Sequence, residues 1–219
     1  PRYNMARQPL WHDDYWLMLI QIYMKKPVGV KPLYSRQLVD LGMELHIHPQ
    51  YLHRMMTKLD EVDSPSIKAL MDSYAHNPKK FRKRVETLRL MKGFGNEHSF
   101  YDGVEVIESF EKYFKPIAGC EHITPMMLVI ILDLYFRLTP QTMVEETPEV
   151  VDMAKMLKIK PQEVVEALKT FCLCDPCIKN KDIDNTMLLE PCQEVWHKYG
   201  SQEQDKLSDL ACKLKDYFS

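Results

Sequence analysis

One stretch of the chain occurs twice, as SRQLVDLGMELHIHPQYLHRMMTKL at Ser35–Leu59 and as TPEVVDMAKMLKIKPQEVVEALKTF at Thr147–Phe171. The two copies align without a gap at an offset of 112 residues. The same offset places WLMLIQIYM, at Trp16–Met24, on LVIILDLYF, at Leu128–Phe136. Six aligned pairs are identical: Val39/Val151, Asp40/Asp152, Leu45/Leu157, Ile47/Ile159, Pro49/Pro161 and Gln50/Gln162. A repeat of this length decides the architecture first, and it predicts a duplicated helical unit.

Each copy predicts three helices with short connections. Apolar residues recur at helical spacing, and Pro49 and Pro161 suit the first position of a helix, where the missing N–H costs nothing. The expected helices run over 13–25, 35–44 and 49–59 in the first copy, and over 125–137, from 147 and from 161 in the second. Strand signals are few, so we expect an all-α fold.

The segments outside the repeat set the expected boundaries. Three of the seven glycines lie within 92–103, which favours lobes at 1–92 and 104–219 joined by a linker at 93–103. In the first lobe, Asn77 and Pro78 predict the start of a further helix. In the second lobe, 179–185 is the place for a small β-wing, and two C-terminal helices follow.

Both copies contain residues in the order of a helix-turn-helix. A small residue lies in the first helix, the turn comes four residues later, and apolar residues then anchor the second helix. These positions hold Gly42, His46, Ile47, Leu52 and Met55 in the first copy, and Ala154, Lys158, Ile159, Val164, Ala167 and Leu168 in the second. The small residue lets the two helices approach closely. The chain therefore resembles the helix-turn-helix and winged-helix superfamily, in which the turn position is often glycine.

The third helix of the first copy is the candidate DNA-reading element that this resemblance implies. Its outward residues are Gln50, His53, Arg54, Thr57 and Lys58. Glutamine and arginine make bidentate contacts with base edges in the major groove, and lysine suits phosphate. The second copy instead exposes Glu163 and Glu166, which phosphate repels. If one lobe binds DNA, we expect it to be the first.

A basic helix over 78–92 is the second candidate contact. With Phe81, Val85 and Leu88 turned inward, the residues that project outward are Lys79, Arg82, Lys83 and Arg89. Such a row suits a phosphate backbone, and the alternative is the solvated face of an ordinary amphipathic helix.

The composition limits which other classes of protein the chain can belong to. The net charge is −2, divided into about +4 for residues 1–118 and about −6 for 119–219, which indicates different surfaces on the two lobes. The longest apolar run, at 126–132, is too short to span a bilayer. Six scattered cysteines and the lack of an apolar leader in PRYNMARQ favour the reducing cytoplasm.

Catalytic and metal motifs are weak. The sequence has no phosphate-binding glycine loop and no nucleophile elbow, so we expect neither an enzyme nor a cofactor. A zinc site of Cys174, Cys177, Cys192 and His197 can be written, but buried reduced thiols are the better explanation. The leading hypothesis is a cytoplasmic regulatory protein whose first lobe binds double-stranded DNA, with the second lobe for packing or homodimerisation. The alternative is a protein–protein adaptor that binds no nucleic acid.

Overall fold

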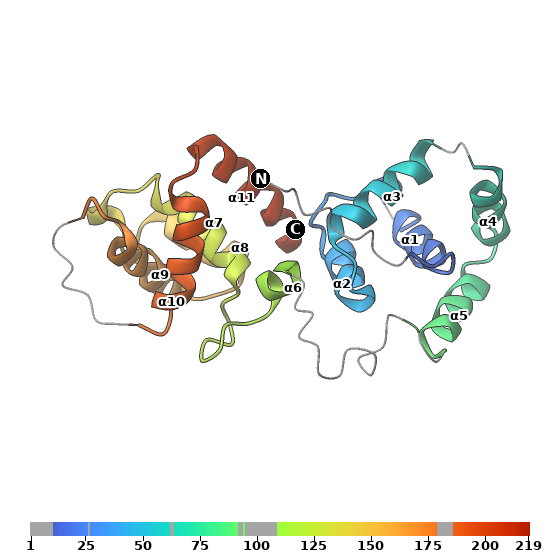
Figure 1. Ribbon diagram of the computed structural model, residues 1–219, viewed down its shortest axis with the longest axis horizontal. Helices are drawn as coiled ribbons and strands as arrows, with labels where there is room; N and C mark the ends of the chain where they lie inside the picture. The colour runs from blue at the N-terminus through green and yellow to red at the C-terminus, as the bar shows by residue number, and fades with distance from the viewer. Residues whose placement is uncertain (1–10, 26, 62–63, 92–93, 95–108, 179–185) are drawn as a thin grey trace, which may run out of the picture. The chain divides into compact units, whose positions relative to one another are not determined.

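The computed structural model describes residues 11–25, 27–61, 64–91, 94, 109–178 and 186–219. These residues are mainly helical and contain no β-strand (Figure 1), which confirms the all-α prediction for the described part of the chain. The chain divides into two compact units, unit 1 at 1–106 and unit 2 at 107–219. The predicted wing at 179–185 lies outside the described residues. So does the predicted linker, except for Phe94, whose ring packs edge-on against Tyr15.

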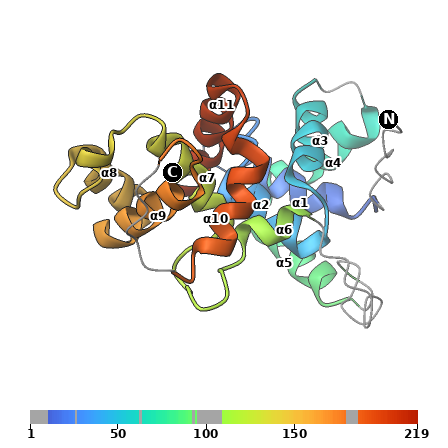
Figure 2. The ribbon, with the colours of Figure 1, turned by 60° about the vertical axis from the view of Figure 1, so that its left-hand side comes forward.

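Unit 1 is built around its first helix. Its helices are α1 (Tyr15–Tyr23), α2 (Arg36–Leu45), α3 (Pro49–Glu61), α4 (Pro65–Ala75) and α5 (Pro78–Arg89). The buried residues of α1 lie on every side of the helix, and α1 contacts α2, α3 and α5. A helix that is apolar all round must be covered all round. In both views α1 lies between α3 and α5 (Figures 1 and 2).

Unit 2 repeats this plan around α7. Its helices are α6 (Ser109–Phe114), α7 (Pro125–Tyr135), α8 (Pro148–Leu157), α9 (Pro161–Cys174), α10 (Leu189–Val195) and α11 (Gln204–Lys215), with short 3-10 or π turns at Pro140–Thr142, Trp196–Gly200 and Asp216–Phe218. α7 contacts α6, α8, α9, α10 and α11, and it is buried from Met126 to Tyr135. Even Asp133 is buried, and its carboxylate accepts a hydrogen bond from Arg137 at 2.9 Å.

The turn between α2 and α3 has the same geometry as the turn between α8 and α9. His46 and Lys158 adopt the left-handed conformation, with φ of 54° and 60°. The next N–H closes each turn: Ile47 donates to the Gly42 carbonyl at 2.9 Å, and Ile159 donates to the Ala154 carbonyl at 3.1 Å. A side chain in this conformation costs about 1–2 kcal/mol, so packing elsewhere in each unit must stabilise the turn.

A tyrosine joins α1 to the end of α3 in unit 1, and another joins α7 to the residue that follows α9 in unit 2. The Tyr23 hydroxyl donates to Asp60 at 2.8 Å, and the Tyr135 hydroxyl donates to Asp175 at 2.8 Å. Burial, together with the neighbouring carboxylate, raises the pKa of both tyrosines. The two tyrosines match in the repeat, whereas Asp175 lies three residues beyond the position that matches Asp60. The helices α1–α3 and α7–α9 thus share an order, a turn and a tyrosine–aspartate contact, while the duplication itself rests on the sequence repeat.

The surroundings of Gly42 show how closely α2 and α3 approach each other. A Cβ at this position would lie 2.7 Å from the Ile47 carbonyl oxygen, so the backbone of the turn must shift to accept it. We expect Gly42→Ala to lower the free energy of unfolding of unit 1 by about 1–2 kcal/mol, because overpacking outweighs the gain in helix propensity. Urea denaturation followed by circular dichroism measures this change. Glu86→Ala, on the exposed face of α5, is the control and should change little. An unchanged stability for Gly42→Ala contradicts the tight turn.

Among the described residues, no helix has the length and apolarity needed to cross a bilayer.

Candidate nucleic-acid interface

The outer face of α3 carries one exposed row. Gln50, Arg54 and Lys58 are exposed and follow one another at four-residue spacing, so their side chains lie along one line of the helix. His53 and Thr57 are half-buried at the margin of this row, where the Thr57 hydroxyl donates to the His53 carbonyl at 3.1 Å. Three of the five predicted reading residues are therefore fully open within unit 1. We call Gln50, Arg54 and Lys58 the α3 row.

The cations of the α3 row are not neutralised locally. Within the part of the chain that the structure describes, neither Arg54 nor Lys58 forms an ion pair with a carboxylate. The Arg54 guanidinium lies 5.5 Å from the centre of the Tyr51 ring, a cation–π contact that holds the side chain on the helix surface. The first turn of α3 contains no acidic residue, so the positive end of the helix dipole also remains uncompensated there.

His48 fixes the start of α3. The Gln50 backbone N–H donates to the Nδ1 atom of His48 at 3.1 Å, so the ring must be neutral at this nitrogen. Burial lowers the pKa of His48 below its ordinary value. The imidazole therefore replaces the usual serine or aspartate as the acceptor for an N–H group of the first helical turn.

We expect this contact to make the stability of unit 1 depend on pH. Because the pKa of His48 is lower in the folded protein, the unfolded chain binds the proton first as the pH falls. The contribution of His48 is complete above pH about 6.5 and decreases below it, which should lower the melting temperature by a few degrees between about pH 7.5 and pH 5.5. Thermal unfolding of the wild type and of His48→Gln measures the effect. Identical pH profiles for the two proteins contradict it.

The basic helix forms at Pro78–Arg89 and ends before the predicted boundary at residue 92. Phe81, Val85 and Leu88 are buried, and the Asn77 side chain caps the helix by accepting the Lys80 N–H at 3.1 Å. The cations exposed on the first two turns are Lys79, Lys80, Arg82, Lys83 and Arg84, and none of them pairs with a carboxylate among the described residues. Lysines at a helix N-terminus oppose the helix dipole, so this cluster lowers the stability of α5.

Arg89, the fourth residue predicted to hold phosphate, is already paired. Its Nε atom lies 2.7 Å from Glu44 Oε1, and a second nitrogen lies 3.1 Å from Glu44 Oε2. This bidentate contact joins the end of α5 to the end of α2 and neutralises the arginine. Arg89 thus stabilises the packing of two helices, and its charge is not free for a ligand.

The structure does not bring the two predicted groups together. α3 and α5 lie on opposite sides of α1 (Figures 1 and 2), and each helix buries its apolar residues in the core of unit 1 and exposes its cations. The sequence could not provide this result, because it depends on how α5 packs and not on any local pattern.

The matching face of unit 2 is acidic and partly closed. The positions that correspond to the α3 row hold Gln162, Glu166 and Thr170. Thr170 is fully buried, and its hydroxyl contacts the Glu166 carbonyl at 2.7 Å and the Thr186 hydroxyl at 3.1 Å. Glu163 caps its own helix by accepting the Lys160 N–H at 2.8 Å. Unit 2 therefore has neither the cations nor the open row of unit 1.

Of the three cysteines that were expected to be buried reduced thiols, Cys192 is buried, whereas Cys174 is half-buried and Cys177 is exposed. Cys192 and Cys172 are buried, and burial raises the pKa of both thiols. The Cys172 sulfur lies 3.8 Å from the Met143 sulfur, inside the core. Across the described residues, no three histidine, cysteine or carboxylate side chains are grouped to hold a metal ion.

The chain is an all-α protein of two helical units with an exposed basic row on α3. No family model, curated protein or solved structure matches it.

Proposed function

We propose that unit 1 binds double-stranded DNA with α3 as its reading helix. The observation that carries this proposal is the α3 row, which is exposed, carries two cations without carboxylate partners among the described residues, and follows a tight left-handed turn. In a helix-turn-helix, the second helix of the motif lies in the major groove and presents such a row to the bases. The resemblance seen in the sequence and the local geometry of the turn support the same role.

The length of the row suits a groove. Eight residues separate Gln50 from Lys58, which corresponds to about 12 Å along the helix axis at 1.5 Å per residue. The major groove is about 12 Å wide. Gln50, at the start of the helix, is placed to meet a base edge, and Arg54 and Lys58 then approach a guanine or the backbone.

The basic face of α5 has a separate part in this proposal. Because α5 lies on the other side of α1, its cations attract DNA through the field of the whole unit and do not hold the segment that α3 reads. Unit 2, with its acidic surface, packs against a partner or forms a homodimer.

A protein–protein adaptor remains the second candidate. It is favoured by unit 2, which keeps the same helix order and turn with a glutamate in place of the central cation. A unit that keeps this geometry without cations serves a role other than DNA binding.

The two candidates are separated by titration of the full chain into labelled random-sequence duplex DNA. If α3 contacts two to four phosphates, the affinity should fall about tenfold to a hundredfold between about 50 and 200 mM salt. Absence of binding at the lower salt concentration overturns the DNA proposal, because non-specific electrostatic binding precedes any specific contact. The adaptor function then becomes the leading one.

A further inference from the structure

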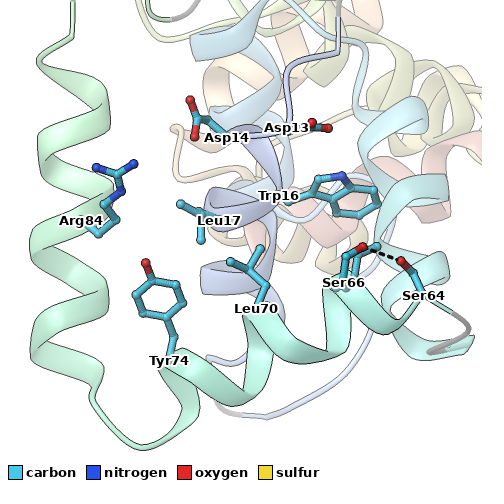
Figure 3. A pocket seen from close by; sticks show the side chains of 10 residues that line it. Asp13, Asp14, Trp16, Leu17, Ser64, Ser66, Leu70, Tyr74 and Arg84 are labelled. Carbon is cyan, nitrogen blue, oxygen red and sulfur yellow. Dashed lines mark hydrogen bonds between the residues drawn. The ribbon is translucent and has the colours of Figure 1, made fainter.

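Unit 1 contains a cavity of 620 Å³ between α1, α4 and α5 (Figure 3). Its apolar lining consists of Trp16, Leu17, Ile67, Leu70 and Tyr74. This volume lies within the range of pockets that bind small organic molecules, about 300–1,000 Å³. The cavity is distinct from the α3 row, none of whose residues line it.

The cavity exists because α4 is packed incompletely. None of the residues of α4 is fully buried, and its apolar side chains, Ile67, Leu70, Met71 and Tyr74, are only half-buried. Near its end α4 is held by Tyr74, whose ring stacks on Phe81 of α5 at a centroid distance of 4.6 Å. An ordinary core helix buries its apolar stripe fully. The stripe of α4 is instead left partly open over Leu17 of α1.

Charged groups surround this apolar lining in a definite order. Figure 3 shows Arg84 and Tyr74 on one side of the cavity and Trp16 with Ser64 and Ser66 on the other. Asp13 and Asp14, at the start of α1, line the edge between them, with Asp13 on the side of Trp16.

The guanidinium of the cavity and its carboxylates do not neutralise one another. The Asp14 carboxylate lies 3.5 Å from the Nδ1 atom of His12, and Arg84 forms no ion pair with any residue that the structure describes. The two serines satisfy each other, with their hydroxyl oxygens 2.9 Å apart. The cavity thus has a carboxylate next to an aromatic ring at one end. At the other end it has a guanidinium, next to a phenol, that pairs with no carboxylate among the described residues. A ligand with two opposite charges could contact both ends.

We propose that this cavity binds a small amphipathic zwitterion, with an ammonium group at one end, a carboxylate at the other and an apolar body between them. The ammonium group lies against Asp13 and the ring of Trp16, where a cation–π contact adds to the ion pair. The carboxylate lies against Arg84, whose planar fork matches it. The body covers Leu17 and Leu70, and removal of this apolar surface from water drives binding. Short apolar peptides with free ends are the simplest compounds of this kind.

The dipeptide phenylalanyl-leucine and its two blocked forms test the proposal on the full chain. The chain has three tryptophans, so the indole N–H signal of Trp16 can be assigned in a ¹H–¹⁵N spectrum with Trp16→Phe. We expect the free dipeptide to shift this signal. The N-acetyl form and the C-terminal amide should each bind about fivefold more weakly, because each lacks one partly exposed ion pair.

Two substitutions each remove the charged side chain that one end of the dipeptide is expected to contact. Asp13→Asn should weaken binding of the free dipeptide but not of its N-acetyl form, and Arg84→Gln should weaken the free dipeptide but not its amide. Lys80→Gln, on the same helix as Arg84 and outside the cavity, is the control. Circular dichroism and the other two indole signals report whether each variant is folded.

Two results overturn the proposal. The first is no shift of the Trp16 signal by any of the three compounds at about 10 mM, a concentration that reveals binding in the millimolar range. The second is an equal loss of affinity for all three compounds in a folded variant. Such a loss would mean that Asp13 and Arg84 do not each contact one end of the ligand. Neither result depends on DNA, so this site and the α3 row can fail separately.

Discussion

The double variant Arg54→Glu, Lys58→Thr is expected to lower the affinity of the full chain for random-sequence duplex DNA about a hundredfold at low salt. The two new residues are those that unit 2 carries at positions 166 and 170. Both replaced side chains are exposed, so the core of unit 1 is untouched. Two phosphate contacts are lost and a carboxylate is placed against the backbone. The slope of log K against log salt should also decrease by about two, one for each lost contact.

A matched variant on α5 is the control for net charge. Arg82→Glu with Lys83→Thr changes the charge by the same amount on the opposite side of α1. If α3 contacts the DNA, the α5 variant loses only the long-range electrostatic attraction to DNA, and its affinity for DNA falls a few-fold. Equal losses in the two variants mean that DNA responds to net charge alone, and an unchanged affinity in the α3 variant overturns the role of α3.

Helix starts could be predicted because they are decided locally. Pro49, Pro78 and Pro161 each stand at the first position of a helix, as the sequence indicated. The fixed φ of proline and its missing N–H act over one turn, and no distant residue is needed. The inward residues of α5 were predicted for the same reason, since the period of the helix alone separates its two faces.

One helix of unit 1 escaped the sequence analysis. No element was predicted for Pro65–Ala75, which forms α4 and with it the cavity. The signal was present: Ser64 precedes Pro65, and Ile67, Leu70, Met71 and Tyr74 follow at helical spacing. These four side chains are only half-buried, so they form no complete core. Such a stripe is easily overlooked when helices are predicted from apolar periodicity.

Long-range contacts account for what the sequence could not predict. Arg89 and Glu44 are 45 residues apart, and only the packing of α5 beside α2 makes them partners. The left-handed conformation of His46 and Lys158 was equally hidden, because neither residue is glycine. Here the surrounding helices outweigh the local preference of the chain. The exposure of Gln50, Arg54 and Lys58 was predicted, but His53 and Thr57 of the same predicted set are half-buried, and the separation of α3 from α5 was not foreseen.

The division into two units gives the last prediction, which concerns Phe171. This side chain is fully buried in unit 2, with its ring centre 6.1 Å from that of Tyr135 and 6.4 Å from that of Trp196. We expect Phe171→Ala to lower the free energy of unfolding of unit 2 by about 3–5 kcal/mol, because the lost apolar area is followed by a cavity. The control is Phe171→Leu, which installs the residue found at the matching position Leu59 and should cost distinctly less.

Hydrogen exchange, followed helix by helix, measures where this loss is felt. If the two units unfold separately, amides of α7 and α9 lose protection in Phe171→Ala while those of α1 and α3 keep theirs. Binding of DNA should then survive in a protein whose second unit is largely unfolded, since the α3 row belongs to unit 1 alone. A parallel loss of protection in α1 contradicts independent units and means that the chain unfolds as one cooperative body.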